Sequence, residues 1–532
     1  METKYIFVTG GVLSGLGKGV SAASLGNLLK NSGFSVFVQK LDPYYNTDPG
    51  TMSPYQHGEV YVTKDGAETD LDIGHYERFI GEKFTKNSSY TQGSILFELL
   101  NEERQGKFDG NTVQVVPHVT DKIIEKIKKA GKTSKANFII TEVGGTVGDI
   151  ESQPFIYAIS QFIRMNEKKS MLIHTTYVPF LSASNEFKSK PTQQSISLLQ
   201  SNGLRPNIIL LRGNKEPEAF IVKKIAITSF LNEKFVIPVP NVSNIYKIPN
   251  YFAKYKMSEM VLNYFGMKTQ KPDLTKWNKF IKLIDAEKKG EIKIAMVGKY
   301  AQFPEAYKSI VEAVKVSAIN QMFDVSFKWI KSDGISEKNI KSKISGTDGT
   351  IILPGFGARG FSGKVIVAEY NRDKDIPTFG ICYGFQAMVI AEARRQGIDD
   401  ATSSEVSDEG TFVIDIIKGK DGNIGGTLRL GESTTLHIRG SLISKLYTSD
   451  QSIERHRHRY EANPRYLMQI QNNEFKFTGF DKKQNLAEVV EMPKKKFYLG
   501  VQAHPEFSST PMFEHPLFRG FIKAVIKNKK NG

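Results

Sequence analysis

The chain has very little cysteine and tryptophan, with one cysteine and two tryptophans among 532 residues. A single cysteine, Cys382, excludes an internal disulfide and a zinc site built from several cysteines. No apolar run approaches the roughly 20 residues that span a bilayer. The opening residues also lack the cationic start and small-residue cleavage site of a secretory signal. These absences predict a cytoplasmic protein without a membrane-spanning segment.

Charge is strongly of one sign, with a formal net charge of +16. A basic balance of this size is typical of nucleic-acid binding. The lysines, however, gather in short groups such as 126–129 and 494–496, and aromatic residues do not alternate with them as in RNA-binding segments. We interpret the charge as a lysine-rich surface, part of which serves anionic small molecules, and expect no nucleic acid as a partner.

Strand-like runs alternate with amphipathic helical segments along the chain, a pattern typical of α/β proteins with parallel sheets. The first strand-like run spans residues 5–9, and another starts at 292 after a charged stretch. We predict two Rossmann-like parallel-sheet domains, one with a phosphate loop over residues 1–267 and the other over 291–532. Residues 268–290 are expected to form a helix-bearing linker.

A glycine-rich turn, TGGVLSGLGKG, lies at residues 9–19 between a predicted strand and a predicted helix. Glycines let backbone N–H groups turn inward, and a helix N-terminus adds positive potential, so the turn suits phosphates. Lys18 is expected to reach terminal phosphate oxygens. The usual P-loop pattern would have glycine at Val12, and at Gly19 the Ser or Thr that contacts Mg²⁺. A glycine-rich turn without a ligand therefore stays open as an alternative.

Because that hydroxyl is missing, ligands for Mg²⁺ must come from elsewhere. Glu142 ends a buried strand-like run, where an acidic ligand of the Walker-B kind is expected. Asp72 lies in the acidic stretch 68–72, and on its own it is interpreted as a solvated or capping acid. Mg²⁺ needs only one or two carboxylates beside phosphates and water, so these two would suffice.

Basic residues gather at 188–193 and at 223–224. In an extended segment Lys188 and Lys190 would point the same way, toward one anionic ligand. Ordinary surface lysines are the alternative.

Cys382 lies between Gly380 and Gly384 in a strand–turn–helix pattern typical of a nucleophile elbow. A helix N-terminus at this place lowers the pKa of the thiol. A buried structural cysteine is the alternative. This alternative is less favoured because His504 follows downstream, with Glu506 two residues further on, as a base and its orienting carboxylate.

This order of residues resembles the class I glutamine amidotransferases. In them a Cys–His pair attacks the side-chain amide of glutamine, forms a glutamyl thioester and releases ammonia. An oxyanion hole is expected from backbone amides of the turn 354–360 and of Tyr383.

Long stretches resemble the CTP synthase family over essentially the whole chain. The most specific is KLDPYYNTDPGTMSPYQHGEV at 40–60, followed by DLDIGHYERF at 70–79, and others lie at 112–118, 142–151 and 454–461. The resemblance implies an amidoligase domain fused to an amidotransferase domain. It implies that ATP phosphorylates O4 of UTP, and that ammonia from glutamine displaces this phosphate to give CTP. Relatives are activated by GTP, inhibited by CTP, assemble as homotetramers and can form filaments.

The resemblance also implies roles for individual residues. The expected ATP contacts are Gly15, Leu16, Gly17, Lys18, Gly19, Val20, Lys40, Asp72 and Val242, and the expected Mg²⁺ ligands are Asp72 and Glu142. The expected UTP and CTP contacts are Ser14, Asp149, Ile150, Glu151, Lys188, Ser189, Lys190, Pro191, Thr192, Gln193 and Lys224. The expected glutamine contacts are Gly355, Tyr383, Gly384, Phe385, Gln386, Glu405 and Arg459. Arg459 would pair with the α-carboxylate and Glu405 with the α-ammonium group.

This chain departs from the family in the glycine turn before the cysteine. The family has Pro-Gly-Gly-Phe-Gly, whereas residues 354–357 read Pro-Gly-Phe-Gly, one glycine short. Which amide fills the oxyanion hole is therefore open. Tyr383 and Phe385 also replace smaller or aliphatic residues, which could tighten the glutamine pocket or the ammonia entrance.

Two other functions are alternatives to CTP synthesis. An amidating ligase of the cobyrinic-acid type would lack the triad glutamate and the 40–60 signature. A nucleotide-gated switch or structural filament protein with a decayed rear domain is disfavoured because Cys382, His504 and Glu506 are all intact.

Overall fold

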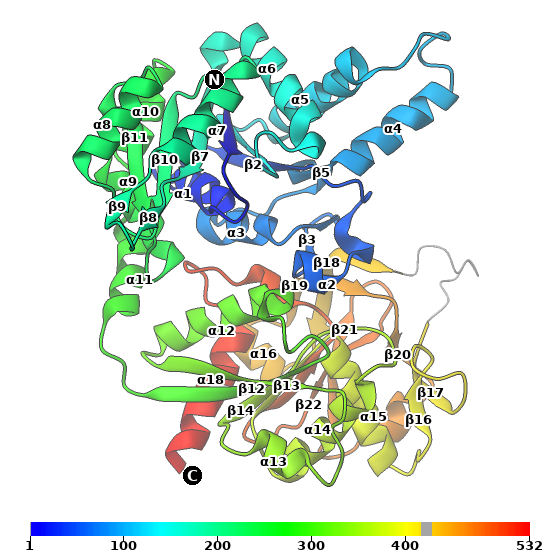
Figure 1. The fold of residues 1–532 in the computed structure, drawn as a ribbon. Helices are drawn as coiled ribbons and strands as arrows, with labels where there is room; N and C mark the ends of the chain where they lie inside the picture. The colour runs from blue at the N-terminus through cyan, green and yellow to red at the C-terminus, as the bar shows by residue number, and fades with distance from the viewer. Residues whose placement is uncertain (1, 417–427, 532) are drawn as a thin grey trace. The chain divides into compact units, whose positions relative to one another are not determined.

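The computed structural model describes residues 2–416 and 428–531 (Figure 1). The predicted domain ends at residues 1 and 532 lie outside the described residues. The chain forms two compact units. The first comprises residues 1–52 and 72–281, and the second comprises residues 53–71 and 282–532. Segment 53–71 therefore belongs to the second unit by its contacts, although residues of the first unit flank it in sequence.

The first unit is built on a seven-stranded sheet with the order β11-β10-β7-β1-β6-β2-β5. Every pairing in it is parallel, as predicted. Such a sheet is covered on both faces, which explains its nearly continuous Val, Ile and Leu runs. Its strands are β1 (Lys4–Gly10), β2 (Val36–Asp42), β5 (Ser89–Thr91), β6 (Phe138–Val143), β7 (Ser170–Tyr177), β10 (Ile208–Gly213) and β11 (Val236–Pro240).

Helices pack against this sheet and fix the ends of its strands. Phe7 of β1 packs among apolar residues of α5 (Thr120–Ser134) and α6 (Gln153–Met165). Helix α1 (Lys18–Asn31) ends before Gly33, whose φ of 88° is left-handed, as expected for a helix-terminating glycine. The other helices are α3 (Asp72–Ile80), α4 (Gln92–Arg104), α7 (Lys190–Ser201), α8 (Ala219–Thr228), α9 (Ile248–Lys254), α10 (Met257–Tyr264) and α11 (Thr275–Asp285), and a small hairpin pairs β8 (Phe180–Leu181) with β9 (Glu186–Phe187).

The second unit is built on a nine-stranded sheet with the order β13-β12-β14-β15-β23-β22-β21-β18-β19. The first five strands are parallel, as predicted for this domain. The other strands pair antiparallel, which was not predicted, so the sheet is mixed. Short connections join β21 to β22 and β22 to β23, which permits their antiparallel pairing. The strands are β12 (Glu291–Gly298), β13 (Asp324–Lys331), β14 (Gly349–Ile352), β15 (Thr378–Ile381), β18 (Arg429–His437), β19 (Gln451–His458), β21 (Lys476–Asp481), β22 (Ala487–Glu491) and β23 (Tyr498–Val501).

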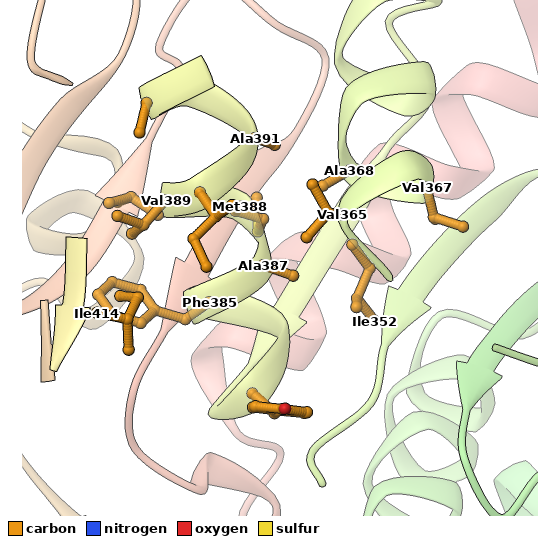
Figure 2. Close-up of a cluster of buried hydrophobic side chains, with 14 of the residues drawn as sticks. Ile352, Val365, Val367, Ala368, Phe385, Ala387, Met388, Val389, Ala391 and Ile414 are labelled. Carbon is orange, nitrogen blue, oxygen red and sulfur yellow. The ribbon is translucent and has the colours of Figure 1, made fainter. Parts of the chain in front are cut away.

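Two apolar cores lie on opposite faces of this sheet. Figure 2 shows one of them, where α15 (Tyr383–Arg395) and α14 (Phe361–Asp373) pack beside Ile352 of β14. The other core is formed with α12 (Lys308–Asn320) and α18 (Pro516–Asn531). Smaller elements are α2 (Pro54–His57), β3 (Tyr61–Val62), β4 (Glu68–Thr69), α13 (Ile340–Ile344), β16 (Ala401–Ser403), β17 (Thr411–Asp415), α16 (Leu442–Tyr447), β20 (Glu461–Ala462) and α17 (Leu467–Ile470).

A search of residues 2–416 and 428–531 finds no helix both long and apolar enough to cross a membrane.

Candidate active sites

The phosphate loop connects β1 to α1 through residues with left-handed backbones. Gly15 and Gly17 have φ of 73° and 79°, and Val12 has φ of 82° at the place where a P-loop usually carries glycine. Lys18 folds back beneath the loop, where its ammonium donates to the Gly145 carbonyl at 2.6 Å. Burial lowers the pKa of Lys18. A phosphate placed in this loop would therefore meet a lysine that is already partly desolvated.

Asp72 and Glu142 converge on Gly19, in the first turn of α1. A Cβ on Gly19 would lie 3.1 Å from a carboxylate oxygen of each acid. The two carboxylates thus lie where the usual P-loop has its Ser or Thr. Asp72 forms an ion pair with Lys40, and Glu142 accepts a hydrogen bond from the Tyr76 hydroxyl. Burial and the neighbouring Asp72 charge raise the pKa of Glu142.

This donor set fits a divalent cation held together with phosphates. The Asp72 charge contributes to the raised pKa of Glu142, and a cation between the two carboxylates would offset this repulsion. Among the described residues, no group of three or more His, Cys, Asp or Glu side chains is arranged to hold a metal. Mg²⁺ does not require such a cage, because phosphate oxygens and water complete its coordination.

A buried histidine beneath the phosphate loop was missed from the sequence. His174 of β7 has its Nδ1 2.9 Å from Thr9 Oγ1 and its Nε2 2.8 Å from Ser195 Oγ. Burial and the Lys18 charge lower the pKa of His174 to about 3, so the ring is neutral. A Cβ on Gly11 would lie 1.6 Å from Ser195 Oγ, which explains the glycine there. The available signal was a histidine inside an apolar strand.

Arg212, at the end of β10, was also missed. Its guanidinium donates to the Val239 carbonyl at 2.7 Å and to the Pro240 carbonyl at 3.3 Å. Its Nε lies 3.9 Å from the position of a Cβ on Gly17. Arg212 therefore links the phosphate loop to the segment just before Val242, which was expected on the adenine side.

The expectation that Lys188 and Lys190 lie in an extended segment is wrong. Ser189 has φ of −81° and ψ of −14°, and Lys190 begins α7. Pro191 favours this helix start because its fixed φ suits the first turn. Lys188 forms an ion pair with Glu186 at 2.5 Å, whereas Lys190 is exposed.

The other predicted UTP contacts also lie in the first unit. The Thr192 hydroxyl donates to the Tyr177 carbonyl at 2.9 Å and fixes α7 to β7. The Asp149 carboxylate accepts from the Thr146 amide at 3.0 Å, which shapes the turn before α6. The remaining predicted contacts are Ser14 in the phosphate loop, the exposed Ile150 and Glu151, the half-buried Gln193, and Lys224 on α8.

In the second unit, Cys382 lies in a strained turn between β15 and α15. Its φ of 52° and ψ of −101° are unusual for a residue with a side chain. Its amide donates to the Val501 carbonyl at 2.8 Å, which ties the turn to β23. A Cβ on Gly384 would lie 2.2 Å from the Ile352 carbonyl oxygen, so only glycine fits there. The thiol is thereby held at the N-terminus of α15.

His504 and Glu506 form the rest of the predicted triad. His504 Nδ1 lies 2.8 Å from Glu506 Oε1, and the His504 amide donates to the Arg455 carbonyl at 2.8 Å. The imidazole stacks on Phe507 with ring centroids 5.3 Å apart. Although burial opposes it, the charges of Glu506 and Cys382 raise the pKa of His504 to about 10. These charges therefore favour the protonated imidazolium form of His504.

Among the predicted glutamine contacts, Glu405 and Gln386 are held by hydrogen bonds, whereas the side chain of Phe385 is buried in the core. Glu405 accepts from the Gly357 amide at 2.8 Å, and burial raises the pKa of its carboxyl while the exposed Arg459 lowers it. Gln386 is buried and donates to the Tyr460 carbonyl at 3.1 Å. Phe385 is fully buried in the core (Figure 2), so its side chain does not narrow a pocket as considered from the sequence.

Segment 53–71 is built into the same unit, close to the triad. A pocket beside Cys382 is lined by His504 and by residues 58–60 of this segment. The fully buried Arg455 donates to the Tyr61 hydroxyl at 2.8 Å, and that hydroxyl donates to the Phe507 carbonyl at 3.1 Å. The segment therefore contacts Arg455, whose carbonyl accepts from the His504 amide, and Phe507, on which the His504 ring stacks. No local pattern in the sequence indicates this packing.

A strained cysteine with a His–Glu pair, joined in one chain to a phosphate-loop unit, defines a glutamine-dependent amidoligase. Residues 4–267 match the family described as CTP synthase N-terminus, and residues 303–524 match glutamine amidotransferase class-I. The chain is 52% identical to a CTP synthase of Mycoplasmopsis pulmonis, over 99% of this chain and 98% of that one. It is 46% identical to a CTP synthase of Mycoplasma capricolum, over 99% and 100% of the two chains. The chain belongs to the CTP synthase family.

Among solved structures, the glutaminase domain of Trypanosoma brucei CTPS with bound acivicin is 32% identical, with a TM-score of 0.41. The match covers 44% of this chain and 94% of that chain. Family membership makes the chain a glutamine-hydrolysing ligase that uses ATP, and an amidating ligase of the cobyrinic-acid type is not favoured.

Proposed function

We propose that the chain converts UTP to CTP through a 4-phosphorylated UTP intermediate, with ammonia that Cys382 releases from glutamine. The observation that supports this proposal is the presence of two clusters of candidate catalytic residues in one chain. One has Asp72 and Glu142 converging on the phosphate loop, and the other has Cys382 beside His504 and Glu506. We also propose residues 1–267 and 291–532 as the two functional domains, with 268–290 as the linker.

In the first unit, loop amides and Lys18 hold the phosphates of ATP, and Lys40 makes a second phosphate contact. Asp72 and Glu142 would hold Mg²⁺, which neutralises phosphate charge when bound. O4 of UTP attacks the γ-phosphoryl group and ADP leaves. Ammonia then attacks C4 and phosphate leaves. UTP is held by the residues assigned to it above, whose lysines match its triphosphate, and CTP shares part of this site.

In the second unit, the Cys382 thiolate attacks the amide carbon of glutamine. His504 gives its proton to the departing ammonia, and a thioester remains. Water then loses a proton to His504, attacks the thioester and releases glutamate and the thiolate. Glu506 holds the imidazole in orientation throughout. Arg459 pairs with the α-carboxylate of glutamine and Glu405 with its α-ammonium group, and amides near Gly355 and Tyr383 stabilise the oxyanion.

Regulation and assembly follow the family resemblance. We propose activation by GTP, inhibition by CTP, a homotetramer, and a capacity for filaments. Exposed apolar side chains on the first unit support a second copy as partner, among them Phe97 and Leu100 of α4 and Met165 of α6. The cytoplasmic location stays a prediction from the sequence.

The test is CTP formation from UTP and ATP with Mg²⁺, measured side by side with glutamine and with ammonia as nitrogen source. Both should yield CTP, and glutamine should yield one glutamate per CTP when the activities are coupled. If CTP forms from neither source, with or without GTP, the proposal is wrong.

A further inference from the structure

A buried lysine lies directly beneath the turn that precedes Cys382. Lys364 of α14 is only 1% exposed. Across residues 2–416 and 428–531, no carboxylate lies within the 4.0 Å of an ion pair from its ammonium group. Lysine is almost never fully buried unless it is paired. Burial accordingly lowers the pKa of Lys364 to about 7, which shows how poorly the surroundings accept its charge. The unfavourable burial of the Lys364 charge indicates a role beyond packing.

The ammonium group of Lys364 binds the backbone where the turn begins. It donates to the Leu353 carbonyl at 2.5 Å and to the Pro354 carbonyl at 3.3 Å. Its Nζ also lies 4.9 Å from the centre of the Tyr383 ring. Lys364 therefore connects the end of β14 with the first residue of α15, which directly follows the nucleophile.

The rest of the turn is held in the same way by other side chains. Lys299 donates to the Phe356 carbonyl at 3.2 Å, and the Tyr383 hydroxyl donates to the Gly357 carbonyl at 2.8 Å. The amides of Gly355 and Phe356, by contrast, donate to no acceptor in the part of the chain that the structure describes. The turn thus has most of its carbonyls bound and two of its amides available.

Peptide geometry connects these two observations. In a trans peptide the carbonyl of one residue and the N–H of the next point in opposite directions. A Pro354 carbonyl held by Lys364 therefore directs the Gly355 amide away from Lys364. Gly355 and Phe356 line the same pocket as Cys382 and His504, so these amides belong to the wall of the reaction site.

We propose that Lys364 is a positioning residue for glutamine hydrolysis, which fixes the shortened glycine turn so that the Gly355 amide meets the oxyanion formed at Cys382. The inference rests on the proposed hydrolysis of glutamine by Cys382. It answers which amide serves the oxyanion hole in a turn one glycine shorter than that of the family. Tyr383 also helps to fix the turn through its hydroxyl, which binds the Gly357 carbonyl and which a smaller aliphatic residue could not supply.

The test uses Lys364→Met in the full-length protein, because methionine keeps the unbranched apolar stem and removes only the ammonium group. We expect kcat for glutamine hydrolysis, measured as glutamate release, to fall roughly 10- to 100-fold, somewhat less than loss of an oxyanion donor itself. KM for glutamine should change less than about threefold, because the turn acts on the transition state. Ammonia-dependent CTP formation should stay at the wild-type level, and Tm should change little, because removal of a buried charge without a carboxylate partner offsets the loss of two hydrogen bonds.

Two further variants complete the test. Lys374→Met, at the exposed C-terminal end of the same helix, should leave every measured quantity unchanged. Tyr383→Phe should lower kcat in the same direction as Lys364→Met, because it releases the Gly357 carbonyl and keeps the ring.

Three results would overturn the inference: kcat of Lys364→Met within twofold of wild type, a rise in KM at constant kcat, or a parallel loss of ammonia-dependent synthesis. A wild-type protein that hydrolyses no glutamine would instead contradict the proposed function itself.

Discussion

The phosphate loop of the first unit and the cysteine turn of the second unit both connect a strand to a helix, but different side chains support them. Each places a reactive group at the start of a helix that follows a buried parallel strand, and each lacks one part of its usual pattern. The phosphate loop lacks a hydroxyl at Gly19, and the carboxylates of Asp72 and Glu142 occupy that place. The cysteine turn lacks a glycine, and Lys364 and Tyr383 bind its carbonyls. In both, side chains from outside the turn contact it where part of the usual pattern is missing.

The two sites differ in how charge is balanced. At the phosphate loop, burial and the Asp72 charge raise the pKa of Glu142, and the proposed Mg²⁺ would offset the charges of the two carboxylates. At the cysteine turn, the charges of Glu506 and Cys382 raise the pKa of His504 against the effect of burial, without any ligand. Variants of the first site should therefore respond to ligand concentration, whereas variants of the second should respond to pH.

The largest expected effect concerns Lys18. Lys18→Ala should lower CTP formation by about 1,000-fold or more with either nitrogen source, because phosphoryl transfer loses its fixed cation. Glutamate release should persist. Lys128→Ala, an exposed lysine of α5 in the same unit, is the matched control and should keep full activity. CTP output of Lys18→Ala near the wild-type level would mean that the loop does not bind ATP.

The next effect concerns the orienting carboxylate of the triad. The charge of Glu506 raises the pKa of His504 to about 10 against the effect of burial, so the imidazolium persists through the neutral range. Glu506→Gln removes that charge, and burial then lowers the pKa of His504. We expect glutamine hydrolysis to fall about 100-fold. The pH profile of glutamate release should move to lower pH in the variant, because His504 then loses its proton at lower pH. Identical pH profiles would contradict the ion pair.

A smaller effect is expected from Glu142→Gln, which removes one charge from the carboxylate pair. Half-saturation for Mg²⁺ in ammonia-dependent CTP formation should rise about 10- to 100-fold, since one of two protein ligands loses its charge. Glutamate release should be unaffected. Glu167→Gln, in the same unit and outside the site, serves as control. An unchanged Mg²⁺ dependence would assign the ion to other residues.

The smallest effect is expected from Tyr61→Phe, which tests the role of segment 53–71. The variant loses the hydroxyl that links Arg455 to the Phe507 carbonyl and keeps the ring. A lost hydrogen bond of about 1 kcal/mol corresponds to a roughly fivefold fall in glutamine hydrolysis. Ammonia-dependent CTP formation should not change. An equal fall in both activities would show that the hydroxyl acts on general stability and not on His504.

Much of the fold could be predicted because its signals are local. The buried strand-like runs on either side of glycine turns identified β1, β6 and β15 and the helices that follow them. The glycines beside Cys382 and the short spacing of His504 and Glu506 likewise indicated a triad. The antiparallel pairing of strands β18 to β22 was not recognised, because strand order and direction depend on contacts between separate segments of the chain.

Other features depend on tertiary contacts that no local pattern contains. Arg455 and Tyr61 are 394 positions apart in sequence and still share a buried hydrogen bond. The convergence of Asp72 and Glu142 on Gly19 required the folded α3 and β6, although a resemblance to a family indicated both acids. Lys188 and Lys190 were wrongly placed because Pro191 starts a helix earlier than the alternating lysines suggested.

The central claim is that one chain divides ammonia release and UTP amination between two sites. Cys382→Ala tests it most directly, in an assay of CTP formation with glutamine and with ammonia on the same protein preparation. The account predicts that CTP formation from glutamine falls to background while formation from ammonia stays at the wild-type level. Loss of both activities together, or continued use of glutamine, would contradict it.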